Sequence, residues 1–367
     1  MSLEELWHLR NEPRSYSERV ELLLGHLDAE AAKGMVTDLV IFEDEPEDPL
    51  DPSLCRFLIK YREREGRPVI CTGIAPNRER ALLKALAEAV ERTCFYDRGL
   101  SWRTLDCSAN RWSDAGPVLE STNGLAFHTE VQPCLLASLC ELVERHHLAL
   151  HWYTAQPALG RLNCQRLPLL GQAEEVLRSQ GADFHALLLD RLGPLTTVGL
   201  LARTKREDVG FHLLFSTACG LELEPTLRRA WGELVCQYRS HPLLRALERG
   251  GPPDTVTSIE EHDLYYQRPD RLAVFDTLLD CEPCEPCSDL PAQEVGVEVL
   301  PSFLREWSIE VAVAQLPETL AGTWLMHCAS PRLVNLGFGK RESLNRTRLE
   351  AILGRSLPGT CPPHPLP

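Results

Sequence analysis

The chain alternates between short, largely apolar runs and longer segments whose apolar residues recur at helical spacing. The run "RPVICTGIAP" at 67–76 predicts a buried strand that leads into a glycine turn, and the segment after it predicts a helix. Similar patterns predict further elements: helices within 1–35 and over about 225–239, strands at 36–42, 152–157 and 209–221, strands with a short helix within 184–205, and a helix and a strand within 289–316. Strands that alternate with helices predict a mixed α/β fold.

One sequence pattern occurs three times in the predicted helices. Residues 82–92 read "LLKALAEAVER", and residues 135–145 read "LLASLCELVER". A weaker copy, "LRRAWGELVCQ", occupies 227–237. Each copy follows a segment with a glycine turn: "CTGIA", "STNGLA" or "STACGL". We interpret the pattern as one strand–turn–helix unit that the chain uses three times.

The two stronger copies place charged residues on one face of a helix. Because positions i, i+3 and i+4 of a helix share a face, each copy groups two glutamates and one arginine. These residues are Glu88, Glu91 and Arg92 in the first copy and Glu141, Glu144 and Arg145 in the second. One such group usually forms only a solvated helix face. Two facing groups would bring four carboxylates together, and these repel one another unless a hard cation such as Mg²⁺ lies among them.

Composition narrows the class of protein. The chain has 367 residues and a formal net charge of −15, which argues against general nucleic-acid binding because phosphates require a basic face. Charged residues interrupt every apolar run near the N-terminus, and no stretch approaches the roughly 18 apolar residues of a membrane span. We therefore expect a cytoplasmic protein that binds no membrane, whose 14 cysteines are core thiols rather than disulfides.

The paired motifs resemble those of the YcaO family. The resemblance rests on "TGIAPNRERALLKALAEAVER", "STNGLAFHTEVQPCLLASLCELVERHHLALHWY", "CGLELEPTLRRAWGELVCQ" and the terminal "PHPLP". It covers residues 55–367, which we expect to form a YcaO domain with a proline-rich tail, preceded by a helical and strand-containing segment at 1–54. The resemblance implies a YcaO-type α/β fold with an ATP site between helices.

The resemblance also implies the ligands of that site. YcaO proteins bind ATP without a Walker A loop and use Mg²⁺ held by carboxylates. The implied Mg²⁺ ligands are Glu88, Glu91, Glu141 and Glu144, and the implied ATP contacts are Asn123, Arg92, Arg145 and Arg229. The P-x-P-x-P ending resembles that of azoline-forming members, whose C-terminus is thought to reach the active site. The carboxylate of Pro367 would then be a catalytic base.

Many YcaO proteins are ATP-dependent cyclodehydratases that act on ribosomal precursor peptides. A Cys, Ser or Thr side chain attacks the preceding amide carbon, the amide oxygen takes the γ-phosphoryl group, and loss of phosphate leaves a thiazoline or oxazoline. The resemblance implies this activity, with a thiazole/oxazole-modified, bacteriocin-like product. The implied partners are the precursor peptide, a leader-binding protein of the E1-like or ocin-ThiF-like type and a flavin dehydrogenase, within a homodimer or a hetero-oligomeric complex.

Two other functions share these motifs. Thioamide-forming YcaO proteins use the same ATP residues with an external sulfur source. A non-catalytic scaffold subunit is the second alternative, and departures from the family pattern motivate it. Lys84 stands where many relatives have serine, His128 and Thr129 replace an Asn-Thr pair, and His146 replaces a frequent aspartate. The four glutamates are unaffected by these changes.

Two further clusters could bind metal. "CEPCEPC" places Cys281, Cys284 and Cys287 at metal-like spacing, but no second C-x-x-C supplies a fourth ligand. We therefore expect an exposed acidic loop there rather than a zinc site. His147 and His151 are four residues apart on the second motif helix, where packing in the core is favoured over metal binding.

Overall fold

The chain forms two compact units. The computed structural model describes residues 2–9, 14–44, 50–96, 99–117, 122–256, 259–284, 299–337, 340–359 and 361–366. Unit 1 comprises Met1–Glu47, Pro52–Glu141 and Leu300–Pro331, and unit 2 comprises Asp48–Asp51, Leu142–Val299 and Arg332–Pro367. Helix α4 (Val131–Thr154) contributes residues to both, because the middle segment of unit 1 ends within it, at Glu141.

Unit 1 contains two antiparallel sheets. Besides the first part of α4, its elements in chain order are α1 (Leu3–His8), α2 (Tyr16–Ala32), β1 (Val36–Asp44), β2 (Cys55–Glu63), β3 (Pro68–Ala75), α3 (Arg78–Tyr96), β4 (Ser101–Asp106), β5 (Arg111–Ser113), β6 (Leu125–His128), α10 (Leu300–Glu306), β12 (Glu310–Gln315), the 3₁₀ turn η4 (Glu318–Leu320) and β13 (Trp324–Ala329). The strand orders are β1-β2-β3 and β5-β4-β12-β13-β6. In the second sheet, Trp324 of β13 pairs with His128 of β6, so a distant segment fixes the strand that leads into α4.

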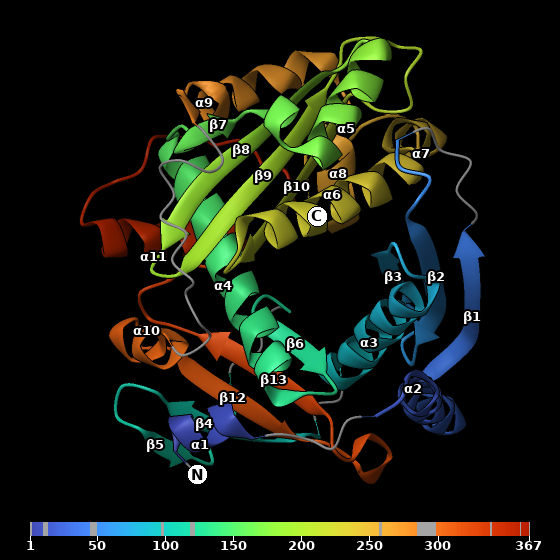
Figure 1. Cartoon of the computed structure of the whole chain (residues 1–367), viewed down its shortest axis with the longest axis vertical. Helices are drawn as coiled ribbons and strands as arrows, with labels where there is room; N and C mark the ends of the chain where they lie inside the picture. The colour runs from blue at the N-terminus through green and yellow to red at the C-terminus, as the bar shows by residue number, and fades with distance from the viewer. Residues whose placement is uncertain are drawn as a thin grey trace. The chain divides into compact units, whose positions relative to one another are not determined.

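Helix α3 covers one face of the first sheet (Figure 1). Its apolar residues Leu86 and Val90 are fully buried, as their helical spacing predicts. Gly73 lies within β3, where a Cβ atom would be 1.9 Å from the carbonyl oxygen of Ala81 and 2.4 Å from the amide nitrogen of Ala85. The sequence analysis assigned this glycine to a turn, and that assignment is wrong. Gly73 instead lets the backbone of α3 approach the strand.

Unit 2 is built around one five-stranded sheet with the order β10-β9-β8-β7-β11. Besides the rest of α4, its elements are β7 (Gly160–Leu162), η1 (Cys164–Arg166), α5 (Pro168–Ser179), β8 (Asp183–Leu192), β9 (Leu195–Arg203), β10 (Leu213–Gly220), α6 (Leu223–Arg239), α7 (Pro242–Glu248), α8 (Ile259–Tyr265), η2 (Pro269–Phe275), α9 (Asp276–Leu279), β11 (Pro283–Cys284) and α11 (Lys340–Leu353). Helix α6 packs on β9 and β10. The second part of α4 joins a separate apolar cluster in which Trp152 lies with Leu187 and Phe215 of the sheet.

The threefold strand–helix unit predicted from the sequence is present as β3–α3, β6–α4 and β10–α6. Two predicted elements are wrong. Residues 152–157 do not form a strand, because α4 continues to Thr154 and buries Trp152 and Tyr153. Residues 184–205 contain no helix and form the hairpin of β8 and β9. Within the described part of the chain, no helix is both long and apolar enough to cross a membrane.

Candidate functional site

The first motif lies on α3, where its charged residues are tied to neighbouring elements. The backbone N–H of Thr72 in β3 donates a hydrogen bond of 2.9 Å to Oε2 of Glu88. Arg92, one turn later, lies 3.5 Å from Oε1 of Glu88 and donates to the hydroxyl of Thr122 at 3.1 Å. Both side chains retain about a third of their exposure, 32% for Glu88 and 30% for Arg92. The predicted polar face therefore exists, and it is held in place rather than simply solvated.

Glu91 and Glu141 form a pair of neighbouring carboxylates within unit 1. Burial raises the pKa of Glu91 well above its usual value, and the negative charge of Glu141 raises it further. Arg92 and a backbone hydrogen bond from Phe127 act in the opposite direction without reversing the shift. Two close carboxylates do not both ionise readily without a compensating positive charge. This pair therefore favours either a bound proton or a bound cation.

The turn that holds Asn123 is fixed by hydrogen bonds within unit 1. Gly124 adopts φ = +75°, which favours glycine. Its carbonyl oxygen accepts a bond of 2.5 Å from the hydroxyl of Ser138 on α4 and one of 2.9 Å from the N–H of Cys328 on β13. His327 is hydrogen-bonded to the backbone of Asn123. The turn is therefore anchored to the second motif helix, and Arg92 reaches it through Thr122.

Within unit 2, Glu144 is the most deeply buried residue of the second motif face, with 7% exposed. The hydroxyl of Thr217 on β10 donates a bond of 2.6 Å to its Oε1, and Nη1 of Arg145 lies 3.5 Å from the same atom. Sequence reasoning missed Thr217, although it lies in the "STACGL" segment of the third copy. Arg229 on α6 donates to the carbonyl oxygen of Cys219 at 2.9 Å, two residues further along β10.

The structure brings the predicted residues together within each unit. In unit 1 these are Glu88, Glu91, Arg92, Glu141 and the turn with Asn123, and in unit 2 they are Glu144 and Arg145, with Arg229 bonded to the same strand as Thr217. Glu141 and Glu144 are three residues apart on α4 and so share a helix face. Pro367, the predicted catalytic residue, lies outside the described residues.

The residues that depart from the family pattern have local partners. The ammonium group of Lys84 donates to the carbonyl oxygen of Ile74 at 3.1 Å. Nδ1 of His128 accepts the N–H of Glu130 at 2.9 Å. Nδ1 of His146 accepts the N–H of Val334 at 3.2 Å. Lys84 thus binds the end of the strand that precedes its own helix, His146 binds a backbone group distant in sequence, and His128 caps the turn that begins α4.

The histidines that follow the second motif lie in the core of unit 2. Nδ1 of His147 lies 2.7 Å from the hydroxyl of Thr197, and Nε2 of His151 lies 3.1 Å from a carboxylate oxygen of Asp190. Burial lowers the pKa of His147 to about 3, so its imidazole is neutral at physiological pH. These contacts agree with the predicted packing role.

The described part of the cysteine-rich segment, residues 281–284, matches the predicted exposed loop only in part, since Glu282 and Pro283 are exposed. Pro283 and Cys284 form β11, which pairs in parallel with β7, and the thiols of Cys281 and Cys284 are partly buried. A Cβ on Gly160 would lie 2.7 Å from Sγ of Cys284, so this strand packs closely against its neighbour. Cys287 lies outside the described residues. Among the residues that are described, no cluster of His, Cys, Asp or Glu has the geometry of a metal site.

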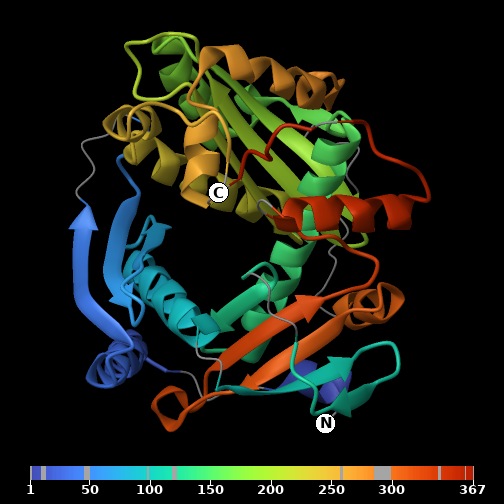
Figure 2. The ribbon, with the colours of Figure 1, turned by 180° about the vertical axis from the view of Figure 1, so that it is seen from behind.

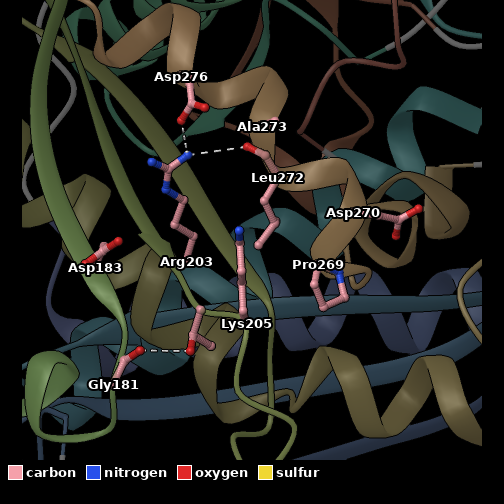
Figure 3. A pocket seen from close by; sticks show the side chains of 10 residues that line it. Gly181, Asp183, Arg203, Lys205, Pro269, Asp270, Leu272, Ala273 and Asp276 are labelled. Carbon is pink, nitrogen blue, oxygen red and sulfur yellow. Dashed lines mark hydrogen bonds and ion pairs between the residues drawn. The ribbon is translucent and has the colours of Figure 1, made fainter.

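A surface hollow of about 390 Å³ lies elsewhere in unit 2 (Figure 3). Arg203 crosses it to reach Asp276 at 2.6 Å, and the Lys205 side chain extends beside Leu272. Its charged residues have both signs and are mostly exposed. None of the motif residues lines it, so this hollow is separate from the chemistry that the sequence indicates.

The sequence and the fold both resemble those of known proteins. The model of a family described as YcaO cyclodehydratase, ATP- and Mg²⁺-binding, matches residues 100–329. No curated protein matches the sequence. The fold is similar to YcaO from Methanopyrus kandleri bound with AMPPCP and Mg²⁺, with a TM-score of 0.63 and 16% identity over 88% of this chain and 92% of that one.

Two further solved structures share the fold. One is the E. coli microcin synthetase McbBCD complex with pro-MccB17 bound, with a TM-score of 0.61 and 15% identity over 80% of this chain and 88% of that one. The other is a heterocyclase in complex with substrate and cofactor, with a TM-score of 0.64 and 15% identity over 98% of this chain and 60% of that one. At these identities the likeness establishes the fold.

The matching family model describes a class of protein that binds ATP and Mg²⁺. The chain belongs to the YcaO family, because the family model matches more than half of it. This confirms the resemblance and the fold class predicted from the sequence. ATP and Mg²⁺ are the cofactors of the chain, as the family description states.

Proposed function

We propose that this protein uses ATP to activate backbone amides of a ribosomal precursor peptide and cyclises Cys, Ser or Thr residues to thiazolines or oxazolines. The observation that carries the proposal is the pair of neighbouring, partly buried carboxylates of Glu91 and Glu141, to which Glu88 adds a third negative charge. Burial and like charge make this pair unfavourable without a cation. On a helix face with no ligand, two neighbouring carboxylates would only reduce the stability of the fold.

The residue types suit the cofactors that the family binds, because Mg²⁺ prefers carboxylate oxygens and arginine pairs with phosphates. Glu88, Glu91, Glu141 and Glu144 would hold Mg²⁺, and Asn123, Arg92, Arg145 and Arg229 would contact the nucleotide. Bound MgATP supplies a phosphoryl group that turns an amide oxygen into a leaving group. The chain's own residues neutralise the phosphates and fix their position, because arginine can bind two phosphate oxygens at once. The hydrogen bonds of Glu88 to Thr72 and of Glu144 to Thr217 hold two of the carboxylates in position.

The carboxylate of Pro367 is proposed as the base that takes a proton from the reacting peptide. The C-terminal segment supports this role, since residues 361–366 are bound within unit 2 and Arg145 is near enough to His364 to influence its titration. Removing Pro363–Pro367, or adding residues after Pro367, is expected to reduce cyclisation more than about tenfold with little change in ATP affinity. Full cyclisation by the extended protein would exclude the carboxylate.

The protein is proposed to act in the cytoplasm with other proteins. A leader-binding protein of the E1-like or ocin-ThiF-like type would deliver the precursor peptide, and a flavin dehydrogenase would oxidise azolines to azoles. A homodimer or a hetero-oligomeric complex would provide the assembly. The structural similarity to the McbBCD complex with pro-MccB17 bound is consistent with a peptide substrate in a multi-protein system.

The mass of a treated peptide tests the proposal. A short cysteine- or serine-containing peptide, incubated with this protein, its partner and MgATP, should lose about 18 Da per ring, whereas a thioamide would add about 16 Da, because water leaves in one case and sulfur replaces oxygen in the other. Glu91→Gln and Glu144→Gln should abolish the change. Glu79→Gln, an exposed substitution in the first turn of α3, is the matched control and should leave it intact. Unmodified peptide and no ATP consumption with wild-type protein would favour the scaffold function.

A further inference from the structure

The C-terminal segment, residues 361–366, is held in unit 2 by side chains of two helical segments. In Figure 2 it leaves α11, passes α4 and ends beside α8. Three consecutive carbonyl oxygens of this segment each accept a hydrogen bond from an aromatic side chain. The bonds are Nε1–H of Trp152 to Pro362 at 2.8 Å, the hydroxyl of Tyr266 to Pro363, and Nδ1–H of His262 to His364 at 2.8 Å.

These donors match what a proline-rich segment can offer. Proline has no N–H, so the backbone of the three prolines among these six residues can only accept hydrogen bonds and cannot complete a sheet ladder. Proteins that recognise extended proline-rich peptides use grooves lined by aromatic donors. Here Trp152, Tyr266 and Phe275 pack against one another with ring centroids 5.2 to 6.1 Å apart. We call Trp152, His262, Tyr266 and Phe275 the tail groove.

The segment is also fixed on its other side. The imidazole of His364 stacks on that of His262, with centroids 4.3 Å apart, and its Nε2–H donates to the carbonyl oxygen of Gly337 at 3.2 Å. His146 of the motif helix binds the same loop through the N–H of Val334. Residues 364–366 are buried, with 5% of Leu366 exposed, whereas residues 361–363 are half-buried. The positive charge of Arg145 contributes to lowering the pKa of His364 further below its usual value, after the larger effect of burial.

We propose that the tail groove is a polyproline docking site and that Trp152, His262 and Tyr266 are positioning residues that hold the C-terminal segment beside the motif helix for the peptide reaction. The link to the reaction rests on the proposed function. Docking itself does not, because it depends only on the hydrogen bonds and the aromatic contacts. The two parts therefore need separate measurements on the full chain.

The thiol of Cys361 reports docking. Its Sγ donates to the carbonyl oxygen of Trp152 at 3.4 Å, and burial raises its pKa to about 11, so it should react slowly with iodoacetamide. His262→Leu and Tyr266→Phe each remove one hydrogen bond and should speed alkylation of Cys361 about tenfold. His262→Asn keeps an N–H near the position of Nδ1 and should restore a rate close to that of the wild type.

Two controls isolate the effect. Tyr265→Phe alters the neighbouring ring, which lies on the guanidinium of Arg271 and makes no bond to the C-terminal segment, so the rate at Cys361 should not change. Cys55 of unit 1 is a partly buried thiol far from the segment in sequence, and its rate should be equal in all variants. Site-resolved mass spectrometry measures both thiols in one sample.

Peptide turnover tests the positioning role. His262→Leu and Tyr266→Phe should lower kcat for peptide modification about tenfold without changing KM for ATP, and His262→Asn should recover most of it. A Cys361 rate unaffected by the first two variants would overturn the docking site. A released segment with unchanged kcat would overturn the positioning role. Wild-type protein that modifies no peptide would contradict the proposed function, while the thiol rates would still decide whether the groove docks the segment.

Discussion

The two compact units bury titratable groups of opposite character. In unit 1, Glu91 lies beside Glu141, and burial with like charge raises the pKa of Glu91. In unit 2, His146, His147 and His262 are buried beside donors and acceptors, and burial lowers their pKa values to about 4, 3 and 4. The histidines become neutral and keep their partners without any ligand. The carboxylates of unit 1 reach a comparable state only with a proton or a cation, which is why we propose them as the binding groups.

The largest expected effects come from substituting two glutamates of the motif helices. Glu91 lies beside a second carboxylate, whereas Glu144 accepts a hydrogen bond from Thr217. Glu91→Gln should reduce peptide turnover about 100-fold or more, because the variant lacks one of the proposed metal ligands. It should also raise the stability of the protein without nucleotide by about 1 kcal/mol, since a buried charge beside Glu141 disappears. Glu144→Gln should abolish turnover without that gain, because Thr217 already satisfies Glu144.

Thermal melting with and without MgATP measures this difference. MgATP at about 100 times its Kd should stabilise the wild type by about 2.7 kcal/mol and should stabilise neither variant comparably. A wild-type response in Glu91→Gln would show that the acidic pair does not hold the cation.

Acid should destabilise the protein through the buried histidines. Their pKa values are lower in the folded chain than in the unfolded chain, where they are near 6.5, so the unfolded chain binds more protons between about pH 6.5 and pH 4. Stability is therefore lost as pH falls through this window, by up to about 3 kcal/mol for each group. Glu91 acts with the opposite sign, because its raised pKa adds stability that is lost as pH rises.

Urea denaturation at pH 7.5 and pH 5 tests whether the free energy of unfolding falls with pH as predicted. His147→Asn, which cannot acquire a charge and can still bond to Thr197, should show a smaller loss between the two pH values than the wild type. An equal loss in both proteins would mean that His147 does not contribute to the acid sensitivity.

Two glycines of the repeated strand–helix unit provide a smaller contrast. At Gly73 a Cβ would collide with the backbone of α3, which cannot move without shifting the helix, so Gly73→Ala should cost about 3 kcal/mol or more. At Gly220 the nearest atom is the hydroxyl of Thr226 at 2.3 Å, and that side chain can rotate. Gly220→Ala should therefore cost only about 1 to 2 kcal/mol.

A third glycine is the matched control. Gly25 lies within α2 with nothing near its Cβ position, so Gly25→Ala should stabilise the protein by up to about 1 kcal/mol. The three free energies of unfolding come from one set of denaturation curves. Equal costs at Gly73 and Gly220 would show that strand–helix spacing is not the deciding factor.

The smallest expected effect concerns the cysteine-rich segment of unit 2. Cys281→Ser combined with Cys284→Ser should leave turnover within about twofold, because the strand that contains Cys284 pairs with β7 and not with an element of the motif. Elemental analysis should find no stoichiometric zinc in the wild type. Zinc that disappears in the variant would give this segment the metal site that its spacing suggests.

Local pattern predicted the repeated unit but not its long-range contacts. The helices α3, α4 and α6 follow from apolar spacing, and the acidic face follows from the i, i+3 and i+4 rule. The strand expected at 152–157 is wrong because burial of Trp152 in unit 2 overrides the strand preference of aromatic residues. Periodicity likewise could not show that Gly73 separates a strand from a helix rather than forming a turn.

The sequence predicted the charged residues of the candidate site but not the residues that hold them in place. Glu88 and Glu144 stand out in the motif, but the groups that hold them come from Thr72 and Thr217, which carry no charge and lie in strands. The tail groove was missed for a related reason. His262 and Tyr266 lie about 100 residues from the carbonyls they bind, and their segment shows no repeat or motif.

The backbone partners of the buried histidines fix which ring nitrogen carries the proton. His128 in unit 1 and His146 in unit 2 accept an N–H at Nδ1, so each carries its proton on Nε2, whereas His262 donates from Nδ1. The chain has 12 histidines in all. Histidine-selective ¹⁵N labelling would therefore give a sparse spectrum in which tautomers identify these rings by their shifts. Such a spectrum would follow the motif helix α4, through His128 and His146, separately from the tail groove, through His262.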